Sequence, residues 1–263
     1  MRTVDCGFRR LAVVGPGLIG GSIELAIRER TPGAGVLLLD RGDDLAAIEA
    51  ADLIVLSAPI LENIRILPAL RPHLSPEAIV TDTASTKAMM VAAAAGMRFV
   101  GGHPVAGAAA AGRSAARADL FAGKPWVLTP TPATPAADVS RVRVFAEALG
   151  ASVQVLPPDE HDRLFAAISH LPQLVASALM DVVGARAGAD GLALAGAGLR
   201  DTIRLASSPP GIWRDIVQTN HANITESLEA MIAELTRLRD DRVGEELTAI
   251  FERAAQWKRT LGG

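Results

Sequence analysis

The 263-residue sequence contains no tyrosine, and its only aromatic residues are six phenylalanines and three tryptophans. A core with so few large rings must be built mainly from Ala, Leu, Val and Ile. The single cysteine, Cys6, excludes an intrachain disulfide framework and a cysteine-rich zinc site. We therefore expect a cytoplasmic protein. We expect no metal site either, because His161 and His170 also lack a metal-ligand spacing.

The chain also has little excess charge, with 26 Lys and Arg against 29 Asp and Glu and a net charge of −3. Such a balance provides no field that would attract nucleic acid. No run of about 18 residues is apolar without interruption by charge, Pro or Gly, so we expect no membrane segment. Residues 1–10 hold no apolar core of a signal peptide. The 49% of hydrophobic residues favours a globular protein over a disordered one.

Short apolar, β-branched segments alternate with helical segments in the first part of the chain. Continuous apolar strands are typical of a parallel sheet buried on both faces, as in βαβ units. The Gly- and Ala-rich stretch 105–123 resembles a mobile loop or lid, and a helix is expected over 137–149. The expected strands are residues 11–14, 36–39, 53–56, 79–81, 98–100, 126–128 and 152–155.

From Asp159 onward the pattern is helical, over 159–168, 174–183 and a long stretch from Trp213 to Gln256. The fold class is therefore α/β, with an N-terminal Rossmann-type parallel-sheet domain over 1–156 and an all-α domain over 157–263. A helical part without an obvious core of its own often packs on a second copy, so we expect a homodimer. The alternative is a monomeric helical cap.

A glycine-rich turn, Gly15-Pro-Gly17-Leu-Ile-Gly20, follows the first strand directly and begins a helix. Gly15 permits the tight turn, Gly17 lets a pyrophosphate approach the backbone, and Gly20 lets helix and strand touch. The helix N-terminus faces the anion. The turn, which includes Leu18 and Ile19, therefore predicts a dinucleotide site, and Ser22 would add a hydroxyl nearby.

Asp40 ends the second strand twenty residues after Gly20. A carboxylate at this position accepts hydrogen bonds from the adenosine ribose and repels a 2′-phosphate, which favours NAD. Arg41 follows directly, and its guanidinium could pair with that phosphate, so NADP remains possible.

Three polar side chains follow neighbouring strands and are expected in the crevice at the carboxyl edge of the sheet. His103 lies in Gly101-Gly-His-Pro104, and Ser85 and Lys87 lie in Thr81-Asp-Thr-Ala-Ser-Thr-Lys87. An imidazole there can accept a proton near neutral pH. Ser85 could also serve as the N-cap of the next helix.

Arg200 and Arg204 are four residues apart and are predicted on one face of a helix. A pair of arginines facing a cleft suits a substrate that carries a carboxylate. The competing interpretation is that both are ordinary surface or ion-paired residues.

Together these segments resemble the prephenate and arogenate dehydrogenase family over about residues 10–224. Each fragment is weak alone, but their order and spacing are specific. The resemblance rests on Gly15-Pro-Gly-Leu-Ile-Gly-Gly-Ser22, Asp52-Leu-Ile-Val-Leu-Ser-Ala-Pro59, Thr81-Asp-Thr-Ala-Ser-Thr-Lys87, Gly102-His-Pro-Val-Ala-Gly107, Asp119-Leu-Phe-Ala-Gly123, His161-Asp162, Ser169-His-Leu-Pro172, Arg204 and Trp213-Arg-Asp-Ile216.

The resemblance implies a nucleotide-binding domain, a helical dimerisation domain and an active site between them. The implied reaction is oxidative decarboxylation, in which a ring carbon loses hydride to nicotinamide and the ring loses CO₂ and becomes aromatic. His103 would accept the hydroxyl proton, Ser85 would orient that hydroxyl, and Arg204 would bind a carboxylate. Further implied contacts are Ser208, Gln173, His161, His170 and Trp213 with the substrate, and Ser57, Ala58 and Pro59 with the cofactor.

Two departures from the family pattern leave the substrate open. Ala108-Ala-Ala110 stands where many members have an acidic residue, and Gln173 stands where many have a second histidine. Prephenate, arogenate and a ring-amino analogue therefore all remain candidates. A β-hydroxyacid or imine dehydrogenase, usually with a lysine on the helical part, is the alternative enzyme. A non-catalytic nucleotide sensor is the third possibility.

Overall fold

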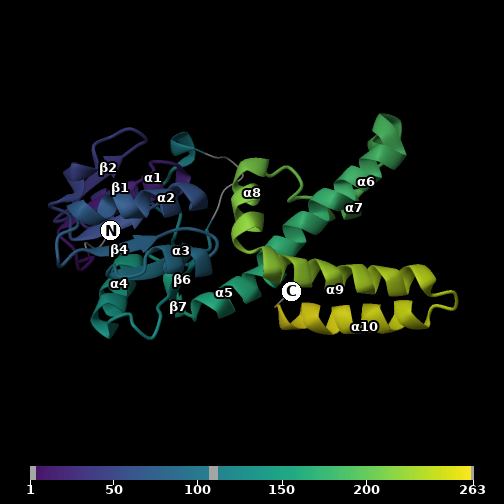
Figure 1. Cartoon of the computed structure of the whole chain (residues 1–263). Helices are drawn as coiled ribbons and strands as arrows, with labels where there is room; N and C mark the ends of the chain where they lie inside the picture. The colour runs from purple at the N-terminus through teal and green to yellow at the C-terminus, as the bar shows by residue number, and fades with distance from the viewer. Residues whose placement is uncertain (1–3, 107–111, 262–263) are drawn as a thin grey trace.

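The computed structural model describes residues 4–106 and 112–261. A seven-stranded sheet with helices packed around it forms the first part, and helices alone form the second (Figure 1). All seven predicted strands are present. They are β1 (Arg10–Val14), β2 (Gly35–Leu39), β3 (Leu53–Leu56), β4 (Ile79–Asp82), β5 (Phe99–Pro104), β6 (Pro125–Thr129) and β7 (Ser152–Val155).

The strand order is β2-β1-β3-β4-β5-β6-β7, and the first five strands are parallel. β6 pairs antiparallel with β5, with His103 opposite Val127, so the sheet is mostly rather than wholly parallel. A parallel pair needs a crossover, usually a helix. In the described part of the β5–β6 connection the only helical piece is η3 (Arg113–Ala115).

The predicted loop or lid over 105–123 is only partly described, because residues 107–111 lie outside the described residues. Its second half is not a free loop. Leu120 and Phe121 are buried in the core of the sheet domain. The main-chain N–H of Arg117 donates to the buried Ser22 hydroxyl, which therefore anchors this segment.

Four helices and two short 3-10 turns surround the sheet: α1 (Leu18–Arg30), η1 (Leu45–Ile48), α2 (Ile60–Leu70), η2 (Arg71–His73), α3 (Ala88–Ala93) and α4 (Ala136–Ala148). The short stretch between Asp40 and Asp52 holds only the η1 turn. Its brevity keeps the region beyond the end of β2 open.

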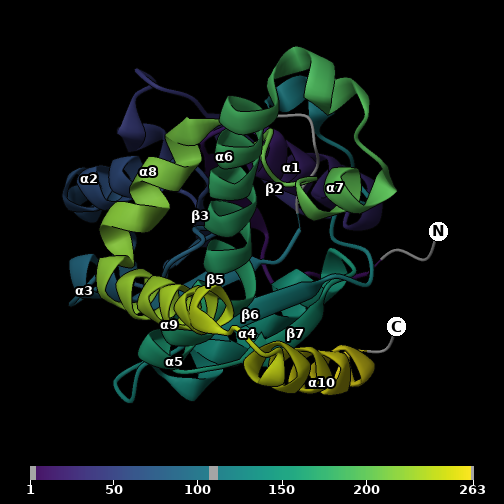
Figure 2. The same cartoon turned by 90° about the vertical axis from the view of Figure 1, so that its right-hand side faces the viewer.

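The second part of the chain consists of α5 (Pro158–Phe165), the π-helical turn η4 (Ala166–His170), α6 (Leu171–Ala193), α7 (Ala197–Thr202), α8 (Pro210–Thr219), α9 (His221–Asp240) and α10 (Glu245–Thr260). The stretch predicted helical over 213–256 is divided among three of these. α9 and α10 run antiparallel and extend away from the sheet (Figures 1 and 2), linked by an Arg253–Glu234 ion pair.

The helical part completes the core on one face of the sheet. Ala166, Ile216 and Ile224 come from it and are buried with Ile54 and Val80 of the sheet. The two parts therefore share apolar packing as well as polar contacts.

The helical run Pro158–Ala193, which has a kink at Gly188, is long and apolar enough by length and composition to cross a bilayer, which the sequence did not lead us to expect. Its first turns carry His161 and Asp162, both buried in polar contacts with the sheet domain. The structure therefore uses this run to join the two parts.

The β1–α1 turn confirms the two conformational roles predicted for its glycines. Gly15 has φ +99°, and a Cβ there would lie 2.6 Å from the Ala58 nitrogen. A Cβ on Gly20 would lie 2.1 Å from the Gly15 carbonyl oxygen, whereas a Cβ on Gly17 would meet nothing within 4 Å. Gly17 thus faces open space beside the turn.

We predict that Gly20→Ala lowers the free energy of unfolding by about 3 kcal/mol or more, because the new methyl group overlaps backbone that cannot move aside cheaply. Gly17→Ala is the matched control and should change it by less than about 0.5 kcal/mol. Urea unfolding of the two variants tests this. Equal stabilities would contradict the close approach at Gly20.

Candidate active site

The carboxyl ends of β1 and β3 form one side of a cleft of about 500 Å³. Adjacent parallel strands bring their following loops together at this edge. The lining contains seven of the predicted cofactor residues: Gly15, Gly17, Asp40, Arg41, Ser57, Ala58 and Pro59. Leu18 and Ile19 instead pack against the apolar core, so their side chains contribute to α1 rather than to the cleft.

The cleft fits a dinucleotide by its shape and by its backbone groups. Gly17 is the N-cap of α1, and no side chain caps the helix there. Free N–H groups at a helix N-terminus attract phosphate. The open space at Gly17 lets an anion approach these groups.

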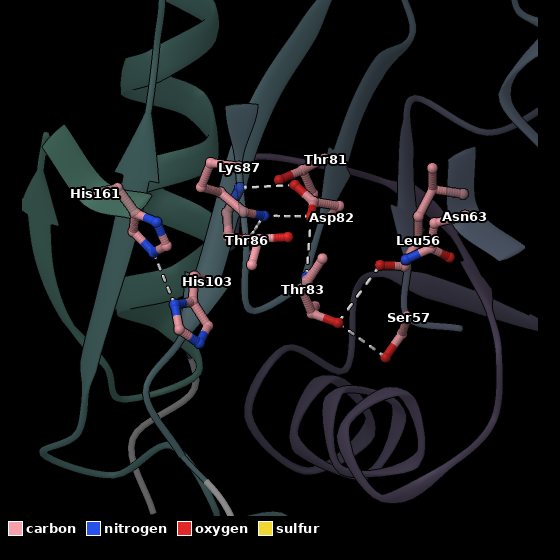
Figure 3. A network of polar contacts seen from close by, with 12 residues as sticks. Leu56, Ser57, Asn63, Thr81, Asp82, Thr83, Thr86, Lys87, His103 and His161 are labelled. Carbon is pink, nitrogen blue, oxygen red and sulfur yellow. Dashed lines mark hydrogen bonds and ion pairs between the residues drawn. The ribbon is translucent and has the colours of Figure 1, made fainter. Parts of the chain in front are cut away.

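Ser57 and Ala58 are held in place by neighbours that the sequence pattern did not identify. The buried Asn63 accepts from the Ala58 N–H at 3.1 Å and donates to the Ala58 carbonyl at 2.9 Å. Thr83 donates to the Ser57 hydroxyl at 3.1 Å (Figure 3). The wall of the cleft is therefore fixed without a ligand.

A buried ion pair between Lys87 and Asp82 lies to one side of His103, above and to its right in Figure 3. Both side chains are fully buried, so Lys87 does not face the crevice as predicted. Lys87 Nζ donates to the Gly102 carbonyl at 2.6 Å, and Asp82 accepts from the Gly102 N–H at 3.0 Å. Burial lowers the pKa of Lys87 while Asp82 opposes that change. The ion pair therefore fixes both main-chain polar groups of Gly102, the residue before His103.

His103 is only 8% exposed, and its Nδ1 lies 2.8 Å from Nε2 of His161 (Figure 3). Phe165 covers both rings, stacking on His161 with centroids 4.3 Å apart and lying 4.7 Å from His103. Burial first, and then His161, Lys87 and His170, hold the pKa of His103 well below 6.5. The imidazole is therefore neutral at neutral pH, the form that accepts a proton.

Asp162 joins the helical part to α3. Its carboxylate accepts from the N–H groups of Lys87 at 2.7 Å and Ala88 at 2.9 Å, and it lies 2.8 Å from His161 Nδ1. The alternative in which Ser85 caps this helix is therefore wrong, because α3 begins at Ala88 and Asp162 occupies its N-terminus. Ser85 lies half-buried in the β4–α3 loop.

His170 lies in the π-helical turn and is buried, with Trp213 edge-on at 6.1 Å between ring centroids. The Asn220 amide is 3.3 Å from His170 Nδ1 and also donates to the Asp162 carbonyl at 2.8 Å. Burial lowers the pKa of His170 to about 4. His170 and Trp213 thus form a group next to the Asp162 junction.

Gln173 and Ser208 contact each other directly. The Ser208 hydroxyl donates to the Gln173 amide oxygen at 3.0 Å, and the Gln173 amide donates to the Leu205 carbonyl at 2.8 Å. These bonds hold the turn that carries Arg204, which is exposed. The prediction that Arg200 and Arg204 share a helical face is wrong, because α7 ends at Thr202.

The predicted site residues therefore fall into groups by contact. Seven of the predicted cofactor residues line one cleft, His103 contacts His161, His170 contacts Trp213, and Gln173 contacts Ser208. Ala108-Ala-Ala110 lies outside the described residues. The residues missed by sequence reasoning are Asn63, Asp82, Phe165 and Asn220, together with the role of Asp162. Asp162 and Asp82 gave a signal, since Asp162 directly follows His161 and Asp82 lies in the motif 81–87.

Comparison with known proteins agrees with this architecture. Residues 20–155 match the model of the prephenate dehydrogenase nucleotide-binding domain, and residues 157–252 match that of the prephenate dehydrogenase dimerization domain. Prephenate dehydrogenase of Bacillus subtilis is 29% identical over 277 residues, covering 94% of this chain and 75% of that one. Cyclohexadienyl dehydrogenase of Zymomonas mobilis is 29% identical over 257 residues, covering 88% of each.

Two solved structures are similar over nearly the whole chain. Prephenate dehydrogenase of Aquifex aeolicus, in complex with hydroxyphenyl propionate and NAD⁺, has a TM-score of 0.86 and 27% identity, covering 96% of this chain and 98% of that one. Synechocystis arogenate dehydrogenase has a TM-score of 0.80 and 31% identity, covering 95% and 99%. The chain belongs to the prephenate dehydrogenase family.

Proposed function

We propose that this protein catalyses the NAD-dependent oxidative decarboxylation of prephenate or arogenate. The observation that carries the proposal is the buried His103, in contact with His161 at the end of a strand of the nucleotide-binding sheet. Burial also lowers its pKa, which favours the neutral form. The names of the relatives support the same reaction.

In this reaction the proton on the ring hydroxyl moves to His103. The O–H electron pair becomes the new C=O bond as the adjacent C–H bond breaks, and the hydrogen leaves with that bond's electrons as hydride, for which the bound cofactor would be the acceptor. The bond to the ring carboxylate then breaks and CO₂ leaves. The freed pair enters the ring, the C=O pair returns to oxygen, and that oxygen takes up a proton, so the ring becomes an aromatic phenol. Ser85 would orient the hydroxyl. Since aromatisation supplies much of the driving force, the protein mainly positions the groups and accepts the proton.

NAD fits the glycine-lined cleft, with its pyrophosphate at Gly17 and the α1 N-terminus, and its adenosine ribose at Asp40. When bound, it would supply the hydride acceptor. Asp40 is exposed at the end of β2 and would repel the 2′-phosphate of NADP. Arg41 is exposed beside it, which keeps NADP as the second candidate.

The substrate side would use Arg204 for a carboxylate, with Ser208, Gln173, His170 and Trp213 around it. Gln173 is neutral, and Ser208 occupies its amide oxygen. Because Gln173 stands where many family members have a histidine, a ring-amino analogue of prephenate is kept as the alternative substrate. His161 is fully buried behind His103, which favours a supporting role over direct substrate contact.

The β-hydroxyacid or imine dehydrogenase alternative has little support. That class usually takes its catalytic lysine from the helical part. After residue 156 this sequence has one lysine, Lys258. Lys258 is exposed in the last turn of α10. It does not line the cleft at the carboxyl edge of the sheet.

We also propose a cytoplasmic homodimer with domains 1–156 and 157–263. β7 ends at Val155 and α5 begins at Pro158. Large apolar side chains remain exposed on α9 and α10, among them Ile232 at 60% and Phe251 at 66%. A second copy packed on these helices would cover them, in agreement with the description of the matched dimerization domain.

We predict turnover of at least one of prephenate, arogenate and 4-amino-4-deoxyprephenate, measured as formation of reduced cofactor with NAD and separately with NADP. His103→Asn should lower kcat by about 10²- to 10⁴-fold, because it removes the base. NAD binding, measured by calorimetry, should persist in that variant. No turnover by wild-type protein that binds NAD would refute the proposed reaction and favour a sensor.

We predict that kcat/KM stays constant as pH falls through 6.5 and declines only at lower pH. The pKa of His103 is lowered, so the base stays neutral and active at pH values where an ordinary histidine would be protonated. Because kcat/KM reports ionisations of the free enzyme, the pH profile should be measured at substrate concentrations below KM. An acidic limb at or above 6.5 would contradict the buried, neutral state of His103.

Light scattering of the purified protein should give twice the chain mass of 27.4 kDa. Phe251→Glu should shift the population towards monomer, since it buries a charge in the proposed interface. Leu37→Glu, at an exposed position of the sheet domain, is the matched control and should leave the dimer intact. A wild-type monomer would refute the dimer.

A further inference from the structure

Three side chains in contact with one another link α3 to the proposed catalytic base, His103. They are the Asp162 carboxylate, the His161 imidazole and the His103 imidazole, joined at 2.8 Å and 2.8 Å. All three side chains are buried. We propose that Asp162 and His161 are positioning residues that fix His103 in the tautomer with its proton on Nδ1 and its lone pair on Nε2. The tautomer follows from the contacts, and only the role of that lone pair as acceptor of the substrate's hydroxyl proton rests on the proposed function.

The donor and acceptor roles in these hydrogen bonds are set at Asp162. Both of its oxygens already accept main-chain N–H groups, from Lys87 and Ala88. Those groups can only donate, so the carboxylate faces His161 as an acceptor. The hydrogen between the two therefore belongs to His161 Nδ1.

A neutral imidazole with its hydrogen on Nδ1 has a lone pair on Nε2. That atom of His161 faces Nδ1 of His103 at 2.8 Å. Burial lowers the pKa of His161, so the neutral form holds at neutral pH. His103 must then donate from Nδ1, which leaves its Nε2 free to accept a proton.

The ring of His103 is fixed on its other sides as well. Phe165 packs against it, and Lys87 and Asp82 hold the peptide of Gly102 just before it. Rotation of the ring would exchange a hydrogen-bonding nitrogen for a carbon at His161. A reversed tautomer would place two lone pairs face to face. Either change costs a buried hydrogen bond.

The chain offers a matched pair of variants at position 161. An Asn amide lies close to the position of Nδ1 and can still donate to Asp162, but it does not reach His103. A Gln amide extends to about the position of Nε2, so its oxygen can accept from His103. His161→Asn should therefore lower kcat by about 10- to 100-fold, the range found when partners that orient metal-binding histidines are removed. His161→Gln should restore most of it.

The melting temperature of both variants and their affinity for NAD serve as controls. A merely structural role would lower the stability of both without separating their kcat values. His73→Gln, at a half-buried histidine outside the site, should leave kcat unchanged. Equal kcat values for wild type, His161→Asn and His161→Gln would overturn the proposal.

A second measurement is independent of turnover. The sequence has five histidines, so their ring nitrogens can be assigned in ¹⁵N NMR spectra from single substitutions. At neutral pH, His103 should show a protonated Nδ1 and an unprotonated Nε2, and His161→Asn should mix the two tautomers.

The reverse tautomer in wild type would overturn the proposal even if the enzyme turns over prephenate. The expected tautomer in a protein that turns over none of the three substrates would instead refute the proposed function and leave the positioning role standing.

Discussion

The Asp162 carboxylate is the contact on which both the domain junction and the active site depend. It belongs to the first helix of the all-α part, yet it caps α3 of the sheet part through two main-chain N–H groups. A carboxylate at a helix N-terminus is stabilised by the free donors and by the helix dipole. The same group contacts His161. One side chain therefore contributes both to the junction between the two parts and to the contacts around His161.

A second contact of the same kind strengthens the junction. The Asp215 carboxylate of α8 accepts from the N–H of Leu61 in the first turn of α2, at 3.3 Å. The Thr86 and Thr219 hydroxyls form a further hydrogen bond across the junction, at 2.8 Å. Directional bonds of this type define one relative orientation, which apolar packing around Ile216 alone would not do. The orientation matters because the site draws residues from both parts.

The elements of the fold could be predicted from local pattern, because strands buried on both faces and glycine turns leave clear signals. The direction of β6 and the end of α7 at Thr202 could not. Both depend on what the connecting segments pack against. Leu120 and Phe121 read as part of a small-residue loop, but they fill the core beside β6. The pattern of a segment does not reveal which distant surface will bury it.

The site shows the same division between local and distant information. The cofactor residues follow strands directly, so the topology alone brings them together. Lys87 was expected in the crevice because it follows a strand, but a carboxylate five residues before it holds it inside. The partners of His103 could not be found from spacing, since 58 residues separate it from His161. The contact exists only when the two parts of the chain are docked.

This arrangement separates binding of the dinucleotide from proton transfer. The cleft is lined entirely by residues of the sheet part, and Asn63 fixes its wall without help from the helices. His103 also lies on the sheet, but the helical part supplies Phe165 and His161, which cover and contact its ring. Burial keeps His103 neutral, and desolvation also strengthens each remaining hydrogen bond. A histidine left at the open sheet edge would titrate near its ordinary value and rotate freely. The helical part thus makes a strand-end histidine buried, oriented and neutral, which is the state that the proposed role as a base requires.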